Sequence, residues 1–207
     1  MAARDRVVKP AAWLLGLTPL AVLAAGGIGV DPIETVTHLT GFWALTLLMA
    51  SLAVSPLRRV TGWNALIGAR KVLGLFAFFY AVLHFATYLV DQSFSWGFIV
   101  ADVVEHWWVT VGFAALLLLV PLALTSTKGA IRRMGKRWQK LHRLVYVAAG
   151  LGVLHFFLLV KKDVTEPLIF AGVFAALMAF RYELVTGGKK RAAGRTPRTA
   201  GEPTRVP

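Results

Sequence analysis

The chain has no cysteine, and this absence excludes several kinds of chemistry at once. Disulfide bonds, iron–sulfur clusters and thiolate metal sites all require cysteine sulfur. Charged residues are also scarce, at 16% of 207 residues, whereas a soluble domain carries about a quarter. Any metal ligands must therefore come from the five histidines or from the ten acidic residues.

Enzyme motifs are missing as well. The sequence has no glycine-rich loop of the dinucleotide-binding or P-loop type. No Ser/His/Asp or paired-carboxylate arrangement can be assembled at one depth along the expected helices. If the chain takes part in a reaction, we expect the chemistry to belong to a bound cofactor.

Apolar residues dominate instead, at 57% of the chain, with a mean hydropathy of +0.65. The pattern predicts an all-α integral membrane protein, a bundle of six spans of about 20 residues each. Residues 1–10 are expected as a cytoplasmic N-terminus and residues 186–207 as a basic, disordered cytoplasmic tail. The first span could also be read as a signal peptide, although we favour an uncleaved helix. The expected spans are Ala11–Val30, Leu39–Val54, Val72–Val90, Trp107–Leu124, Leu141–Val160 and Leu168–Val185.

The connections between these spans alternate in charge. Residues 55–71 carry four Lys or Arg and residues 125–140 carry six, whereas residues 31–38 and 91–106 carry none. The positive-inside rule therefore places both termini in the cytoplasm. The net charge of +13 is mostly a topology signal in a lipid bilayer, and it does not indicate nucleic-acid binding. Seven of the ten acidic residues are expected outside: Asp31, Glu34, Asp91, Asp102, Glu105, Asp163 and Glu166.

Two histidines are expected at nearly one depth, toward the outer ends of the third and fifth spans. These are His84 and His155, and ionisable side chains in hydrocarbon are usually functional. Two histidines that face each other from two helices suit a six-coordinate haem iron, with one imidazole on each axial face. Small residues lie three and seven positions before each histidine on the same helix face, as a flat macrocycle would need: Ala81, Ala77, Gly152 and Ala148. Alternatively, the histidines only hydrogen-bond neighbouring helices and the small residues only permit tight packing.

The other histidines are expected nearer the membrane surfaces. His38 and His106 lie at the outer ends of the second and fourth spans, where most such side chains are merely solvated. His142 opens the fifth span on the cytoplasmic side, next to the basic run Arg132–Lys140. It could ligate a second haem, hydrogen-bond a propionate or help to seat another cofactor.

A family resemblance is carried by three segments: GARKVLGLFAFFYAVLHFATY, VGFAALLLLVPLALTSTKGAIRRMGKRWQKLHRLVY and VLHFF. They resemble the haem-binding membrane subunit (MsrQ) of the bacterial methionine-sulfoxide reductase system, one of the ferric-reductase-like transmembrane domains. The resemblance covers approximately Leu39 to Glu183. The sequence departs from the family at EHWW, residues 105–108, where relatives tend to have a basic residue, Arg-Pro and an aromatic.

The resemblance implies a b-type cytochrome with one haem or two and an associated FMN. By similarity, His84, His155 and His142 are candidate ligands of haem iron, and Arg70 matches a cofactor-binding basic residue at the start of the third span. Electrons would come from the quinone pool or from a cytoplasmic flavin reductase. They would pass to a periplasmic, molybdenum-containing (MsrP-like) subunit that reduces methionine sulfoxide in oxidised proteins. The chain would then be a multi-pass inner-membrane electron-transfer subunit rather than a stand-alone enzyme.

Two other classes of protein compete with this interpretation. Six spans with buried histidines could form a proton- or metal-coupled small transporter, and a structural membrane partner would need no cofactor. Transporters usually contain internal repeats and broken helices around a midplane site. We expect no repeat between the two halves of this chain, and the polar residues within the spans are too few to line a path.

Overall fold

Helices make up all the regular structure in residues 2–26, 30–160 and 162–193, which are the residues that the computed structural model describes. Six long segments are apolar enough to cross a membrane, which confirms the six-span prediction and a multi-pass membrane protein. A short 3₁₀ turn, η1 (Asn64–Leu66), precedes α3. The helices are α1 (Ala2–Ala24), α2 (Pro32–Thr61), α3 (Ile67–Asp91), α4 (Trp96–Glu105), α5 (Trp107–Leu124), α6 (Lys128–Met134), α7 (Lys136–Leu141), α8 (Leu144–Leu159) and α9 (Thr165–Ala193).

Several boundaries differ from the expected ones. α1 ends at Ala24, and residues 27–29, within the expected first span, lie outside the described residues. α2 continues to Thr61 because Gly62 adopts a left-handed conformation (φ 69°) and its N–H closes the last turn on the Arg58 carbonyl. α9 extends to Ala193, into the segment expected as a tail, and residues 194–207 lie outside the description.

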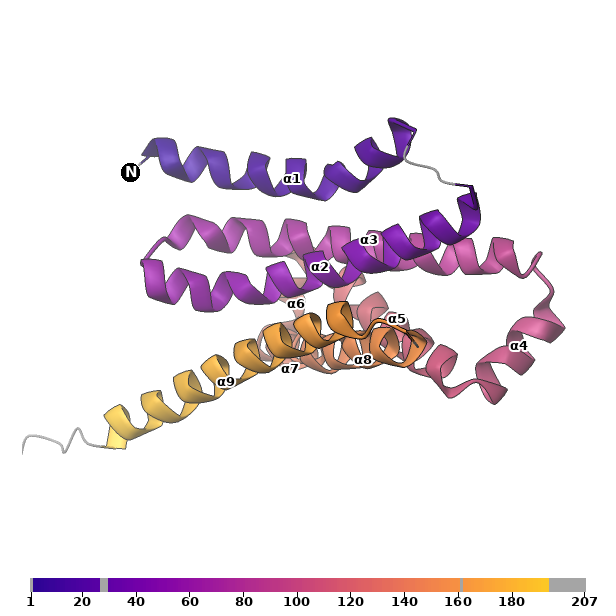
Figure 1. The fold of residues 1–207 in the computed structure, drawn as a ribbon. Helices are drawn as coiled ribbons and strands as arrows, with labels where there is room; N and C mark the ends of the chain where they lie inside the picture. Colours follow the sequence, from indigo (N-terminus) through magenta and orange to yellow (C-terminus); the bar gives the residue numbers. More distant parts are fainter. Residues whose placement is uncertain (1, 27–29, 161, 194–207) are drawn as a thin grey trace, which may run out of the picture.

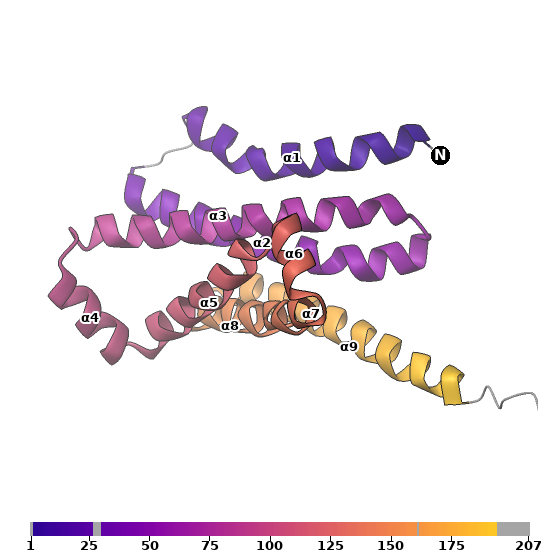
Figure 2. The ribbon, with the colours of Figure 1, turned by 180° about the vertical axis from the view of Figure 1, so that it is seen from behind.

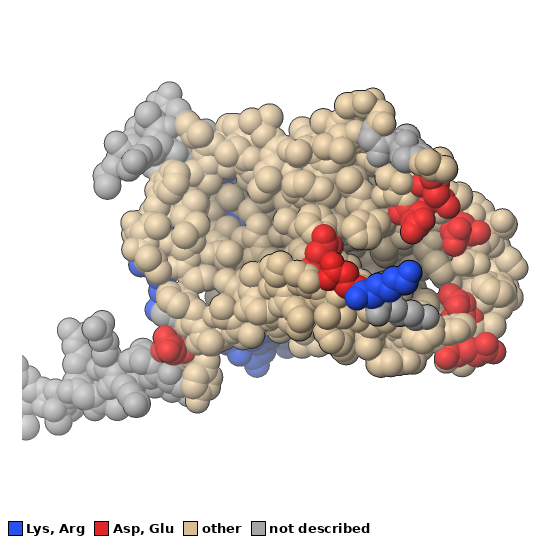
Figure 3. All heavy atoms as spheres, viewed as in Figure 1, with Lys and Arg blue, Asp and Glu red and all other residues tan. Residues whose placement is uncertain are grey.

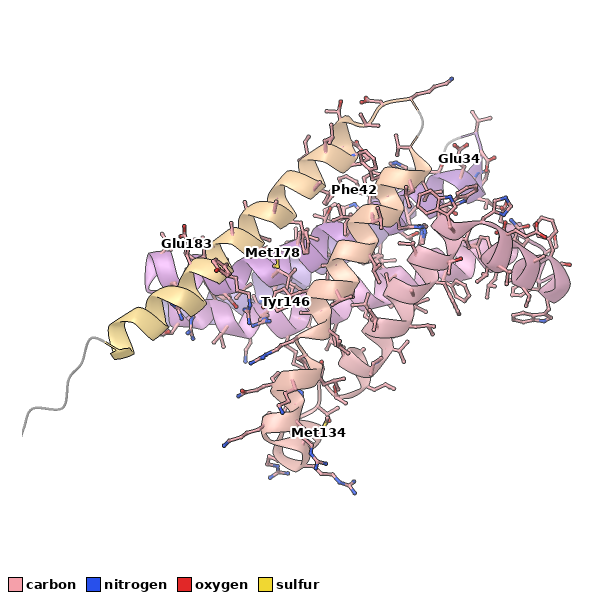
Figure 4. All side chains as sticks on the ribbon, turned by 90° about the horizontal axis from the view of Figure 1, so that it is seen from below. Glu34, Phe42, Met134, Tyr146, Met178 and Glu183 are labelled. Atoms are coloured by element: carbon pink, nitrogen blue, oxygen red, sulfur yellow. The ribbon has the colours of Figure 1, made fainter. Side chains whose placement is uncertain are left out.

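The outer and cytoplasmic connections contain helices that we did not expect. α4 joins the outer ends of α3 and α5, as both ribbon views show (Figures 1 and 2). α6 and α7 form the basic cytoplasmic connection, and the labelled Met134 in α6 lies well away from the other spans (Figure 4). These three helices are short, and a short helix has no long apolar run that would distinguish it from a loop in the sequence.

The spans form three layers, with α1 on one side, α2 and α3 in the middle, and α5, α8 and α9 on the other side (Figures 1 and 2). The α2–α3 and α5–α8 hairpins bury the main apolar core, which includes Leu47, Ala77 and Ala149. α1 is attached to α3 by the buried Tyr80, whose hydroxyl donates to the Gly16 carbonyl at 2.6 Å. α1 is therefore packed as part of the bundle.

The acidic and basic side chains gather in different parts of the structure. Most of the visible acidic side chains lie at the end that carries α4 and the start of α2 (Figure 3). The basic residues of α6 and α7 are exposed on a connection that lies away from α4 (Figures 1 and 2). This arrangement agrees with the topology expected from the alternating loop charges.

Candidate metal centre between two helical hairpins

His84 and His155 face each other across the interior of the bundle. His84 lies in α3 and His155 in α8, and their ring centroids are 6.2 Å apart with the ring planes at 81°. Both side chains are partly buried. The structure therefore brings together the two residues that were expected at one depth.

Each imidazole is held by a backbone carbonyl of the adjacent helix. The Nδ1 atom of His84 lies 2.9 Å from the Thr37 carbonyl oxygen, and Nδ1 of His155 lies 2.7 Å from that of Trp108. Because a carbonyl oxygen can only accept a hydrogen bond, each Nδ1 must carry the proton and donate it. Each Nε2 is then left with a lone pair, which is the state that a metal ligand needs.

The separation of the rings suits two ligands of one metal ion. A metal–imidazole bond of about 2 Å, plus roughly 1.1 Å from the nitrogen to the ring centre, places two opposed ring centroids about 6.2 Å apart. The observed distance is 6.2 Å. The described residues contain no group of three or more His, Asp or Glu that could hold a bare metal ion. Two opposed imidazoles without further protein ligands are what a haem iron requires.

Two glycines that we had not singled out lie directly against the histidine rings. A Cβ atom on Gly41 of α2 would lie 3.0 Å from Nδ1 of His84, and one on Gly112 of α5 would lie 2.6 Å from Nδ1 of His155. Gly41 follows Thr37, and Gly112 follows Trp108, by one helical turn, so each glycine lies one turn after the carbonyl that accepts the hydrogen bond. The same local arrangement therefore occurs twice.

A sequence signal for these glycines exists, and our expectation that the chain has no internal repeat was wrong. GFWALTLL begins at Gly41 and GFAALLLL at Gly112, and VLHF ends one residue after each histidine. In both hairpins the histidine follows its carbonyl partner by 47 residues. The residues shared by the two copies include the histidine and the glycine that lies against its ring, so each hairpin contributes one half of the centre in the same way. Ala77 and Ala148, each about two helical turns before its histidine, are also equivalent and buried.

His142 lies apart from this pair. It lies at the junction that ends α7 and precedes α8, within the segment Lys136–Leu159 that is apolar enough to cross a membrane. Its Nε2 atom lies 3.1 Å from the Thr125 hydroxyl, and its ring stacks on Trp138 with 3.9 Å between centroids. A hydroxyl and an indole therefore hold His142 on the cytoplasmic side.

Arg70 is close to a small cavity in the cytoplasmic half. Its guanidinium donates to the Ser55 hydroxyl at 3.1 Å, and Ser55 lines a cavity of about 20 Å³. On the far wall the Arg181 guanidinium lies 4.3 Å from the ring centroid of Tyr146. Figure 4 shows Tyr146 and Met178, two of the lining residues, near one another on α8 and α9. The other lining residues are Leu52, Pro56, Leu177 and Phe180.

The two remaining histidines differ from each other. His38 is exposed, as expected. His106 is more than a solvated side chain, because its Nδ1 lies 2.8 Å from a carboxylate oxygen of Asp102, which also accepts from the Tyr88 hydroxyl at 2.6 Å. The ring of His106 also contacts Trp108, the residue whose carbonyl holds His155. The departure from the family pattern at residues 105–108 thus lies next to the metal centre.

Comparison with known proteins agrees with this geometry. The family described as ferric reductase like transmembrane component matches residues 40–153. A protein-methionine-sulfoxide reductase heme-binding subunit MsrQ from Rhodospirillum rubrum is 51% identical over 200 residues, which cover 94% of this chain and 95% of the relative. Subunits of the same name from Herminiimonas arsenicoxydans and Brucella anthropi are each 46% identical, over 84% and 86% of this chain and the same shares of their own. The chain therefore belongs to the ferric reductase-like transmembrane family, within its MsrQ group.

Proposed function

We propose that this chain is a b-type cytochrome of the bacterial inner membrane that passes electrons to a periplasmic methionine-sulfoxide reductase. The proposal depends on one observation above all. The ring centroids of His84 and His155 are 6.2 Å apart, and each Nδ1 is hydrogen-bonded to a backbone carbonyl. When bound, the haem iron supplies one-electron redox chemistry. The names of the relatives, as heme-binding subunits, support the same cofactor.

The protein residues fix the two ligands and keep them dry. The carbonyls of Thr37 and Trp108 hold a proton on each Nδ1 and so keep each Nε2 available to the iron. The core around Ala77 and Ala148 is apolar and excludes water, which lowers the local dielectric. Both features would keep the two imidazoles fixed as ligands if haem were bound, and the iron would supply the one-electron chemistry.

The position of the centre supports an outward direction of electron flow. Trp108 lies in the first turn of α5, directly after α4, so the His155 ligand is tied to the outer face of the protein. An acceptor in the periplasm would therefore approach the haem from the side of α4. We propose a molybdenum-containing (MsrP-like) subunit as this acceptor, on the basis of the resemblance and of the names of the relatives.

Electrons would enter at the cytoplasmic side, from quinol or from a flavin reductase. His142, Arg70 and Arg181 are among the polar side chains on that side in the part of the chain that the structure describes. The cavity beside Arg70, at about 20 Å³, is far smaller than the roughly 300–1,000 Å³ of common ligand pockets, so it does not enclose a whole FMN. FMN, a second haem and the identity of the donor stay predictions from the resemblance.

A two-stage experiment tests the proposed function. Protein purified after haem-replete expression is examined by reduced-minus-oxidised spectroscopy, together with the haem-to-protein ratio. We expect sharp b-type bands that quinol or a reduced flavin donor reduces and that an oxidised periplasmic reductase subunit reoxidises. Colourless protein would contradict the haem assignment, whereas a reducible haem that the partner cannot reoxidise would contradict the direction of flow. The transporter alternative predicts no such bands.

A further inference from the structure

Among the described glycines, Gly41 and Gly112 are the two at which an added Cβ would meet a histidine ring. Gly41 and Gly112 lie against the Nδ1 and Cε1 atoms of His84 and His155, on the edge of each ring that bonds the carbonyl. Neither glycine has a left-handed backbone conformation. Glycine is therefore required at these two positions because a side chain would collide with the histidine ring, and not because the backbone needs a conformation that only glycine adopts.

The available space differs between the two halves of the centre. A Cβ on Gly112 would lie 2.6 Å from both Cε1 and Nδ1 of His155, well inside van der Waals contact. A Cβ on Gly41 would lie 3.0 Å from the same atoms of His84, where a shift of a few tenths of an ångström removes the clash. Because each ring is anchored by a hydrogen bond of 2.7 or 2.9 Å, a ring that moves away must lengthen or break that bond.

We propose that Gly41 and Gly112 are positioning residues that set the orientation of the two axial imidazoles and thereby the electronic state of the haem. This inference rests on the proposed function, because it requires the haem. Each glycine lets the imidazole approach its helix closely enough for Nδ1 to reach the carbonyl one turn earlier. The two ring planes that these contacts fix lie at 81° to each other.

Four alanine variants provide a matched test. Gly112→Ala and Gly41→Ala add a methyl group against a ligand ring. Gly150→Ala on α8 and Gly74→Ala on α3 are the controls, since the added Cβ would be 3.5 Å from Phe174 and 3.4 Å from Ser51, which are ordinary contacts. Alanine favours a helix over glycine, so none of these changes weakens the helix itself.

The readouts are the haem content, the midpoint potential and the electron paramagnetic resonance spectrum of the ferric protein. The last of these depends on the angle between the two imidazole planes and does not depend on electron-transfer activity. We expect Gly112→Ala to weaken haem binding by about tenfold, as loss of a ligand-orienting contact commonly does, with altered g values in the haem that remains. Gly41→Ala should retain haem and show a smaller change of the same kind. Both controls should match the wild type.

The outcomes separate this inference from the proposed function. Unchanged spectra and potentials in both Gly112→Ala and Gly41→Ala would overturn the inference while leaving the haem assignment intact. Equal changes in Gly74→Ala and Gly150→Ala would also overturn it, because general helix packing would then be the cause. If Gly112→Ala does not fold, the milder Gly41→Ala variant still decides the question. A wild-type protein without haem would overturn the proposed function itself.

Discussion

Replacing His84 and His155 by alanine, singly and together, tests whether both ligands serve one iron. The structure places the two ring centroids 6.2 Å apart, a distance that leaves room for a single metal ion between them. Each single variant should therefore remove the whole low-spin signal of this haem, and the double variant should remove no more. Residues that act on one group in this way are strongly non-additive.

The size of the effect distinguishes the possible arrangements. If the two histidines belonged to different haems, each single variant would keep about half of the low-spin signal and only the double variant would lose it. With one shared haem, a single variant leaves a five-coordinate, high-spin iron or loses the cofactor. His38→Ala is a suitable control, because His38 lies near His84 but its side chain is exposed.

The assay is the visible spectrum of the reduced and oxidised protein, normalised to protein concentration and to a pyridine haemochrome count of total haem. Size-exclusion chromatography of each variant in detergent shows whether it remains folded. A normal low-spin spectrum in either folded single variant would refute the shared site. Loss of the signal in His38→Ala would indicate that the assay reports general damage instead.

Three further predictions concern topology, the cytoplasmic side and packing. A reporter enzyme fused to the C-terminus should lie in the cytoplasm, and a reporter inserted in residues 91–105 should lie in the periplasm. Finding both reporters on one side would contradict the six-span topology. His142→Ala should leave the spectrum of the His84–His155 haem unchanged and slow its reduction by quinol or flavin, because His142 contacts Thr125 and Trp138 rather than this pair; loss of that haem from a folded variant would show that His142 belongs to its site. Tyr80→Phe should lower the free energy of unfolding by about 1 kcal/mol, since it removes the buried hydrogen bond to Gly16. Thermal unfolding in detergent measures this change, and an unchanged midpoint would mean that α1 does not depend on that bond.

Much of the architecture could be predicted because the bilayer imposes strong, local rules. Backbone groups in hydrocarbon must be satisfied within one segment, so long apolar runs become helices whatever their neighbours are. Loop charges then orient these helices. For this reason the six spans could be predicted from the sequence alone. The short helices α4, α6 and α7 could not, because they belong to connections between spans, where water or headgroups can satisfy backbone groups and long apolar runs are not required.

The pairing of His84 with His155 was also accessible from the sequence, because depth along a span follows directly from residue number. Their shared depth and the small residues beside them were enough to suggest one iron between two helices. The sequence did not show in which direction around its helix axis each histidine side chain points. Only the packed bundle shows that both rings point inward, with 6.2 Å between them.

The contacts that hold the ligands were decided by tertiary structure alone. Gly41 begins a stretch of sequence that recurs at Gly112, but the contacts that give Gly41 and Thr37 a role form only because α2 packs against α3 beside His84. The same is true of Gly112 and Trp108, which α5 presents to His155. A backbone carbonyl has no side-chain signature, so its use as a hydrogen-bond acceptor depends on which helix lies next to it. The sequence by itself determined the six spans, their direction and the depth of the two histidines; the packing of the spans determined which atoms hold each imidazole and how far apart the two rings lie.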